Sequence, residues 1–216
     1  MDIDERYMRR AIQLAKLGAG WVSPNPMVGA VIVREGKIIG EGYHHCYGKA
    51  HAEVNAIASV FDKNLLHDAT IYVTLEPCSH YGKTPPCSEL IIKSGIPRVV
   101  VGMTDPFAKV HGRGINMLRE AGVEVVTGVL EADCQALNKH FVSAHTLHRP
   151  YVLLKWAQSR DGFMDKTRIN GGEPPVRFST SLTTVLMHRE RSHVDAIMVG
   201  ARTVALDDPS LTVRLC

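Results

Sequence analysis

The chain has 216 residues with 45% hydrophobic and 22% charged side chains, which is ordinary for a globular protein with a sizeable core. Its formal net charge of +3 comes from scattered basic residues. A nucleic-acid partner usually requires a basic stripe, so we expect no nucleic acid. There is no recognisable signal peptide and no apolar run that could span a bilayer, so we expect no membrane partner. Five cysteines, an odd number, argue against a secreted disulfide framework and favour the cytoplasm.

The first two thirds of the chain alternate between helical and strand patterns. Apolar residues at helical spacing predict an N-terminal helix that Gly18 ends, and two strand patterns, at 28–33 and 37–43, flank Glu35-Gly36 as a β-hairpin. Further elements are predicted as helix 51–60, strand 70–75, helix 87–94, strand 98–101, helix 114–120, strand 123–126 and helix 131–144. Alternating strands and helices predict an α/β sandwich, and the hairpin makes its sheet mixed.

A second unit begins near Pro150. We expect a strand over 151–157, a helix over 181–191 and strands over 196–200 and 210–214. These elements are too few for an independent domain, so the second unit is expected to be incomplete. We divide the chain into a first domain over 1–148 and a second over 149–216.

One imidazole and two thiols in the first domain have the chemistry of a catalytic zinc site. His51, Cys78 and Cys87 offer three protein ligands, which leaves the fourth tetrahedral position open for water. Zinc lowers the pKa of such a water to about 7. Glu53 is then free to move protons, as the carboxylate of zinc deaminases does. The pattern predicts a hydrolytic deaminase with Glu53 as its proton shuttle.

A structural zinc site is the alternative interpretation of the same residues. It would need a fourth protein ligand, which His44, His45 or Cys46 could supply. The gap between Cys78 and Cys87 is wider than the two residues of the common deaminase signature. Residues 79–86 are polar and rich in proline, as expected of a loop that brings Cys87 back to the metal.

Several motifs resemble the bifunctional riboflavin-biosynthesis deaminase/reductase family. They lie at 23–29, 42–44, 51–53, 74–80 and 82–87, and the second unit adds 155–162 and 200–214. The resemblance implies a cytidine-deaminase-like α/β/α sandwich, followed by the start of a dihydrofolate-reductase-like α/β domain. It also implies replacement of the 2-amino group of a diaminopyrimidinone that carries ribose 5-phosphate, and then NADPH-dependent reduction of the ribosyl group. The family is compatible with a homo-oligomer.

The resemblance also assigns binding residues by position. The deaminase substrate is implied to contact Asn25, His44, His80 and Lys83. In the second domain, NADPH is implied to contact Gln158, Thr203 and Asp207, and the reductase substrate Arg189, Leu211 and Arg214. The chain stops at Cys216, before the later glycine-rich cofactor segment of the family, so we expect no competent NADPH site in these residues.

Two further functions compete with this interpretation. A tRNA or free-base deaminase predicts the shorter Cys-x-x-Cys spacing and a basic flank. A zinc-stabilised binding module without catalysis predicts damage at Glu53 or a fourth protein ligand. Glu53 is present, and the Cys78–Cys87 spacing is long.

Overall fold

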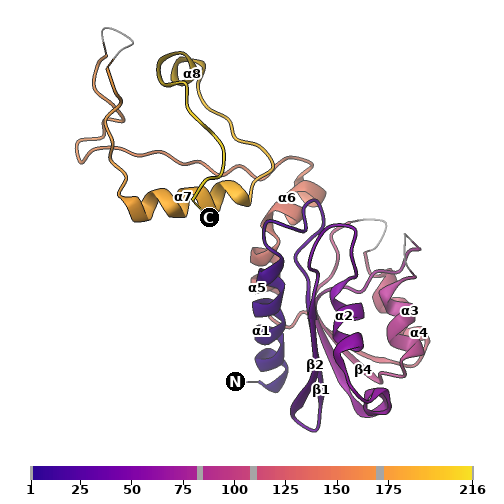
Figure 1. Cartoon of the computed structure of the whole chain (residues 1–216). Helices are drawn as coiled ribbons and strands as arrows, with labels where there is room; N and C mark the ends of the chain where they lie inside the picture. Colours follow the sequence, from indigo (N-terminus) through magenta and orange to yellow (C-terminus); the bar gives the residue numbers. More distant parts are fainter. Residues whose placement is uncertain (1, 82–84, 108–110, 169–172, 216) are drawn as a thin grey trace. The chain divides into compact units, whose positions relative to one another are not determined.

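The computed structural model describes residues 2–81, 85–107, 111–168 and 173–215 (Figure 1). The chain divides into a first unit, Met1–Tyr151, and a second unit, Val152–Cys216. Each unit is described by itself. No helix in the described ranges is long and apolar enough to cross a membrane.

The first unit is built on a five-stranded mixed sheet with the order β2-β1-β3-β4-β5. Its strands are β1 Gly29–Arg34, β2 Lys37–Tyr43, β3 Thr70–Leu75, β4 Arg98–Met103 and β5 Glu124–Thr127. Strand β1 pairs antiparallel with both β2 and β3, whereas β3, β4 and β5 run parallel. The predicted hairpin and mixed sheet are therefore confirmed.

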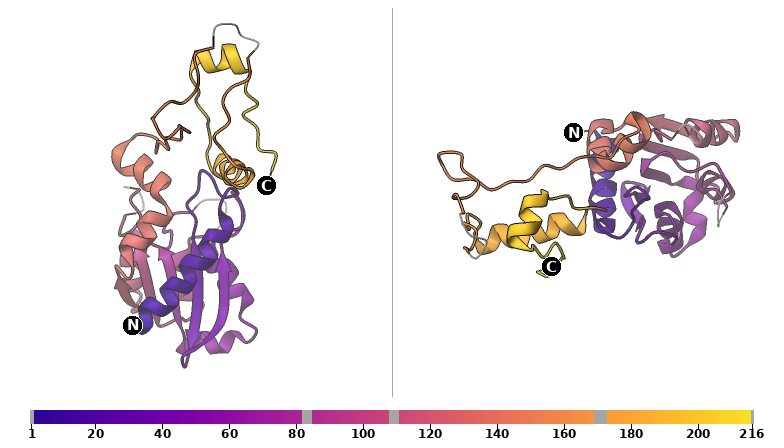
Figure 2. Two further views of the ribbon diagram at one scale, coloured as in Figure 1. Left: turned by 90° about the vertical axis from the view of Figure 1, so that its left-hand side faces the viewer. Right: turned by 90° about the horizontal axis from the view of Figure 1, so that it is seen from above.

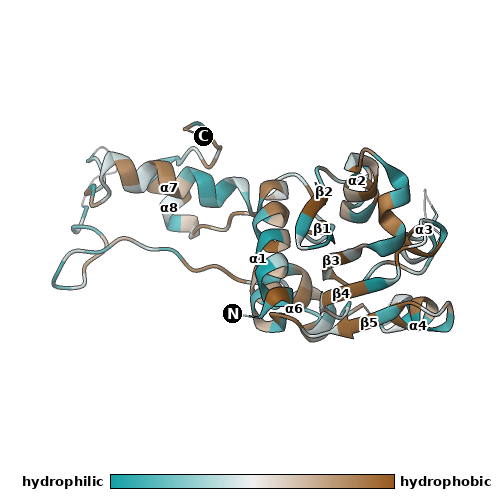
Figure 3. Cartoon of the chain, turned by 90° about the horizontal axis from the view of Figure 1, so that it is seen from below, coloured by the Kyte–Doolittle hydropathy of each residue, from teal (hydrophilic) through white to brown (hydrophobic). Residues whose placement is uncertain are grey.

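Helices cover both faces of this sheet. On one side lie α1 Ile3–Ala15 and α5 Glu131–Leu137, and on the other lie α2 Ala52–Ser59, α3 Cys87–Lys93 and α4 Arg113–Glu120 (Figure 1). Figure 2 shows α1, in indigo, lying across its face of the sheet. Figure 3 shows mixed polar and apolar colours along α1, as expected for a helix with one buried face.

Side-chain alternation along the central strands supplies the two halves of the core. In β1, Ala30 and Ile32 pack with the α2 and α3 side, whereas Val31 and Val33 pack with the α1 side. All four side chains are buried. A strand that is covered on both faces must be apolar at consecutive positions, which explains the unbroken apolar run in this segment.

The predicted single helix over 131–144 is wrong. The structure has α5 and then α6 Lys139–Leu147, with a break at Asn138, whose φ of −112° and ψ of 32° are not helical. The Asn138 side chain hydrogen-bonds the backbone of Met27 through both amide atoms. The non-helical backbone of Asn138 thus coincides with a pair of hydrogen bonds to a partner 111 residues away in sequence.

The second unit departs further from its prediction. Helix α7 Ser181–Ser192 forms as expected, and α8 Ala201–Asp207 forms where no helix was predicted. The described residues of this unit contain no strand, so the strands expected over 151–157, 196–200 and 210–214 are wrong. Strand backbone needs a neighbouring strand for its hydrogen bonds, and these residues supply none to one another. Of all the described residues in the second unit, only His188 is buried.

Candidate functional site

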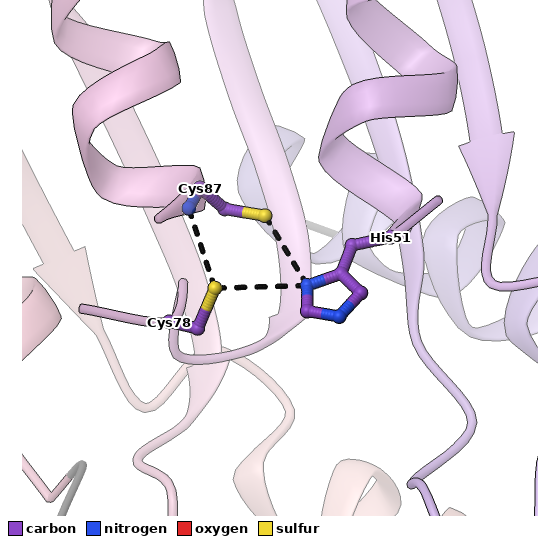
Figure 4. A group of neighbouring side chains, drawn as sticks. All are labelled: His51, Cys78 and Cys87. Atoms are coloured by element: carbon purple, nitrogen blue, oxygen red, sulfur yellow. Dashed lines mark hydrogen bonds between the residues drawn. The ribbon is translucent and has the colours of Figure 1, made fainter. Parts of the chain in front are cut away.

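Three metal-ligating side chains from different elements meet at one edge of the sheet (Figure 4). His51 is the N-cap residue of α2, Cys78 follows β3, and Cys87 opens α3. Their ligand atoms all lie within 4.8 Å of one another, and Cys78 and Cys87 are free thiols. The structure thus brings together the ligands that the sequence predicted, at the ends of elements.

The spacing of these atoms fits tetrahedral zinc. His51 Nδ1 lies 3.6 Å from Cys78 Sγ and 3.4 Å from Cys87 Sγ. Zinc bonds of ordinary length at tetrahedral angles would separate a nitrogen and a sulfur ligand by about 3.6 Å. No fourth histidine, cysteine or carboxylate joins the group in the part of the chain that the structure describes. The ligand set therefore leaves one coordination position for water.

The electrostatics of the cluster favour a thiolate ligand. The Cys87 thiol and the His51 ring lower the pKa of Cys78 to about 4. Cys78 in turn raises the pKa of Cys87, because two adjacent sulfurs without a metal do not both ionise readily. The backbone N–H of Cys87 also donates to Cys78 Sγ at 3.3 Å. These contacts favour the thiolate form of Cys78, which can bind a cation.

Glu53 lies beside the cluster with only 3% of its surface exposed. Burial, and then the negative charge of Cys78, raise the pKa of Glu53 to about 7. A carboxyl group with a pKa near neutrality can both take and give a proton at physiological pH. Its surroundings therefore suit it to proton transfer.

A cavity of about 230 Å³ is lined in part by His51, Glu53 and Cys78. Its walls come from the segment before β1, the ends of β2, β3 and β4, the start of α2, and α6 of the first unit. The lining residues are Asn25, Pro26, Val28, His44, His51, Glu53, Leu75, Glu76, Cys78, His80, Asp105, Phe107 and Phe141. The cavity thus joins the metal cluster to polar and aromatic side chains that could contact a ring.

Two of the predicted substrate residues contact each other in this cavity. The His44 ring faces the Ala50 carbonyl oxygen through Nδ1, at 3.0 Å, and Asn25 Nδ2 through Nε2, at 3.1 Å. A carbonyl only accepts, so Nδ1 carries the proton and Nε2 accepts from the amide of Asn25. Burial lowers the pKa of His44, which favours this neutral form. The amide oxygen and the second N–H of Asn25 are then the groups that it can offer to a ligand.

The other two predicted substrate residues are His80 and Lys83. His80 lines the cavity and is otherwise exposed. Lys83 lies outside the described residues.

Sequence reasoning assigned no role to seven residues of the cavity wall. These are Pro26, Val28, Leu75, Glu76, Asp105, Phe107 and Phe141. Asp105 follows β4 at the sheet edge where Cys78 follows β3, and burial raises its pKa. A carboxylate just after a parallel strand was a usable signal, because such strand ends share one edge. Phe141 carried no such signal, since its helix was predicted without the break that places it.

Glu76 organises one wall of the cavity. Glu76 is 4% exposed, and its carboxylate accepts from the backbone N–H groups of Asp105, Gly112, Gly114 and Ile115 at 2.9–3.4 Å. The last three N–H groups lie at the N-terminus of α4, where a negative charge is favourable. Glu76 thus fixes Asp105 and α4 relative to the strand end that leads to Cys78.

The residues predicted to bind NADPH lie in the second unit. Gln158 accepts a hydrogen bond from Trp156, Thr203 is exposed on α8, and Asp207 is paired with Arg168. No hydrogen bond or ion pair joins Gln158, Thr203 and Asp207 in the described ranges.

Two of the predicted reductase-substrate residues lie near each other, because Arg189 is on α7 and the backbone N–H of Arg214 donates to His188, the neighbour of Arg189, at 3.0 Å. Arg189 is exposed on α7, and Leu211 is half-buried. Arg214 donates to Ser210 and Thr212. These side-chain contacts are local, within a few residues of Arg214.

Comparison with known proteins decides the family. The model of the cytidine and deoxycytidylate deaminase zinc-binding region matches residues 1–103, and that of the RibD C-terminal domain matches 150–216. The riboflavin biosynthesis protein RibD of Aquifex aeolicus is 47% identical over 213 residues, which cover 99% of this chain and 58% of the relative. RibD of Escherichia coli is 44% identical, with 98% and 56% covered.

The chain belongs to the RibD family. Two solved structures support the assignment at the level of the fold. Acinetobacter baumannii RibD matches with a TM-score of 0.89 and 40% identity, covering 98% of this chain and 58% of that chain. The deaminase/reductase of Thermotoga maritima matches with a TM-score of 0.88 and 46% identity, covering 99% and 60%.

Family membership settles the fold class and the metal. The first unit has the cytidine-deaminase-like mixed sheet, and the second unit is the start of the dihydrofolate-reductase-like region of RibD proteins. His51, Cys78 and Cys87 form the zinc site of the deaminase region. The chain spans a little more than half the length of the RibD relatives it matches.

Proposed function

We propose that this chain carries a zinc-dependent hydrolytic deaminase of riboflavin biosynthesis. Its substrate is a diaminopyrimidinone bearing ribose 5-phosphate, as the name of the Thermotoga maritima relative states for that protein. The observation that carries the proposal is the placement of buried Glu53 beside a three-ligand metal cluster, at a cavity large enough for a ring. A merely structural metal would have no use for a buried carboxyl group that titrates near neutrality.

The residues of the chain divide the chemistry between them. When bound, zinc supplies a water of lowered pKa at the open fourth position. Glu53 takes a proton from the attacking water and delivers it to the leaving amine. The new C–O bond replaces the C–N bond, and ammonia leaves. Both transfers need a group that is ionised at the start and protonated midway, which the raised pKa of Glu53 provides.

Substrate binding is assigned to residues of the cavity and its loop. Asn25 is assigned to a pyrimidine edge through its free amide groups, His44 to the same site through its bond to that amide, and His80 to the same cavity. Lys83 is assigned to the phosphate group, because an ammonium suits a doubly charged anion.

In an intact protein of this family the second domain would use NADPH to reduce the ribosyl group. We assign Gln158, Thr203 and Asp207 to the cofactor, and Arg189, Leu211 and Arg214 to the substrate of that step. We place the protein in the cytoplasm, which accords with the free thiols of Cys46, Cys78, Cys87 and Cys134.

Ammonia release tests the deaminase directly. The purified chain is incubated with the pathway pyrimidine, with and without a chelator, and its zinc content is measured in parallel. We expect ammonia release by the chain with about one zinc bound, and loss of both after chelation. Zinc-loaded protein that releases no ammonia would overturn the proposed function.

A further inference from the structure

The segment Asn25–Val28 forms one wall of the cavity, and several of its backbone groups have hydrogen-bond partners. The N–H of Asn25 donates to the preceding turn, and Pro26 has no N–H to satisfy. The carbonyl of Val28 accepts from the backbone N–H of His44 at 2.9 Å. Met27 differs from these neighbours, because both of its backbone groups bond to a side chain. Buried backbone groups need partners, so this side chain decides whether the wall keeps its position.

That side chain is Asn138. Its Oδ1 accepts from the Met27 N–H at 2.8 Å, and its Nδ2 donates to the Met27 carbonyl at 2.8 Å. The amide thus pairs with Met27 as a neighbouring strand would, although the residues are 111 positions apart in sequence. Asn138 is 4% exposed, so water does not readily replace either bond.

The same residue fixes a second wall of the cavity. Asn138 interrupts the helix, and α6 restarts with a hydrogen bond from the Val142 N–H to the Asn138 carbonyl at 2.9 Å. Phe141, one residue earlier in this first turn, lines the cavity. Asn138 therefore ties the segment that carries Asn25 to the turn that carries Phe141. Asn138 itself is not among the described residues that line the cavity.

We propose that Asn138 is a positioning residue of the deaminase site, which sets the spacing between the Asn25 wall and the Phe141 wall. It acts on the substrate through these walls and not by contact. The inference rests on the proposed function of the cavity. A purely structural role would lower stability without a selective effect on substrate binding, and this difference makes the inference testable.

The variant Asn138→Asp tests it with almost no change of shape. The aspartate keeps an acceptor for the Met27 N–H, but places an oxygen against the Met27 carbonyl where Nδ2 had donated. We expect KM for the pyrimidine to rise by about tenfold, with kcat changing less. Zinc content should remain that of the wild type, and hydrogen exchange of the Met27 amide should accelerate, because repulsion between the aspartate and the Met27 carbonyl moves the whole of Met27 away from the aspartate.

Tyr72→Phe is the matched control. It removes a buried hydroxyl that donates to Asp4 at 2.8 Å, at the opposite end of the parallel strands from the cavity. We expect this variant to lose stability without a change in KM or in Met27 exchange. If Asn138→Asp behaved like Tyr72→Phe, with unchanged KM and unchanged Met27 exchange, the inference would be wrong.

The exchange measurement separates this inference from the proposed function. A wild-type chain that releases no ammonia would defeat the proposed function, while Met27 exchange would still report whether Asn138 holds the wall. Unchanged exchange in Asn138→Asp overturns the inference whatever the activity. Faster exchange with an unchanged KM in an active enzyme also overturns it, because the wall would then move without effect on binding.

Discussion

Glu53 and His51 are two residues apart at the start of α2, and their surroundings give them different chemistry. His51 directs Nδ1 at the two sulfurs, whereas Glu53 is buried beside them without joining the ligand set. Burial raises the pKa of Glu53 to about 7. The short spacing follows from the sequence, but the burial that tunes Glu53 comes from the packed elements around it.

Glu53→Gln should separate metal binding from catalysis. The amide keeps the size of the side chain but cannot carry the proton, so we expect ammonia release to fall by at least about 100-fold. Zinc content should stay at the wild-type level, because Glu53 is not a ligand. Glu120→Gln, an exposed change on α4, is the control. Turnover within a few fold of wild type would remove Glu53 from the proton transfer.

Cys87→Ser should abolish zinc retention. A hydroxyl is a much poorer zinc ligand than a thiolate, and two remaining ligands bind weakly. Cys46→Ser is the control, because Cys46 is near His44 and His45 in sequence but lies outside the ligand cluster. Metal analysis after dialysis should show zinc in Cys46→Ser and little in Cys87→Ser. Equal zinc in the two variants would contradict the ligand assignment.

At the scale of elements, the cavity depends on how helices begin. α2 begins after His51 and α3 begins at Cys87, so two of the three ligands are placed by helix starts. The start of α4 is held by Glu76 and packs closely on the strand end, since a Cβ on Gly114 would lie 1.9 Å from the Pro77 carbonyl oxygen. The walls are therefore joined to the zinc ligands through backbone contacts.

Glu76→Gln should weaken the first unit. The amide can accept through one atom only, so at least one of the N–H groups at α4 loses its acceptor, and the helix loses a favourable charge. We expect a loss of roughly 1–3 kcal/mol in the free energy of unfolding, measured by denaturant titration. Glu120→Gln neutralises one exposed charge on the same helix and should cost little. Equal stability of the two variants would contradict the capping role of Glu76.

In the first unit as a whole, the cavity and a stabilising ion pair lie at opposite ends of the parallel strands. The cavity lies at the ends of β3 and β4, whereas an ion pair lies at their starts. There Arg98 contacts Asp4 through two hydrogen bonds of 3.1 and 2.8 Å, and Tyr72 donates to the same carboxylate. The side chains of Asp4 and Arg98 are 13% and 26% exposed, so the pair is shielded from most solvent.

Asp4→Asn should remove a pH-dependent part of the stability. Arg98 lowers the pKa of Asp4 below its ordinary 3.8, so the folded state favours the ionised form. The stabilisation is then present above the ordinary value and is lost as the pH falls through the lowered one. We expect Asp4→Asn to cost roughly 1.5–3 kcal/mol at neutral pH, and the gap to wild type to narrow below the ordinary pKa.

Trp21 fluorescence in a Trp156→Phe background would follow the unfolding of the first unit alone. The control is Glu124→Gln, which removes a 65% exposed partner of the same arginine and should cost less than about 1 kcal/mol. A gap between Asp4→Asn and wild type that persisted unchanged at low pH would contradict the role of the ionised Asp4.

The difference between the two units shows why some sequence predictions succeeded. The strands over 28–33, 37–43 and 70–75 were confirmed because each has a paired neighbour within the first unit. The strand pattern over 151–157 has no ladder in the described residues, and its side chains stay largely exposed. A strand pattern indicates that a segment favours extended backbone, but the strand itself forms only when a neighbouring strand pairs with it.

The sequence by itself determined the chemistry of the metal site, because the residue types His51, Cys78 and Cys87 carry their ligand preferences with them. Only the tertiary structure decided the rest of the site. It buried Glu53, turned the amide of Asn25 toward His44, and broke the helix predicted over 131–144 at Asn138, whose side chain bonds to Met27. Burial and hydrogen bonds between residues far apart in the chain depend on packing, which no local pattern records.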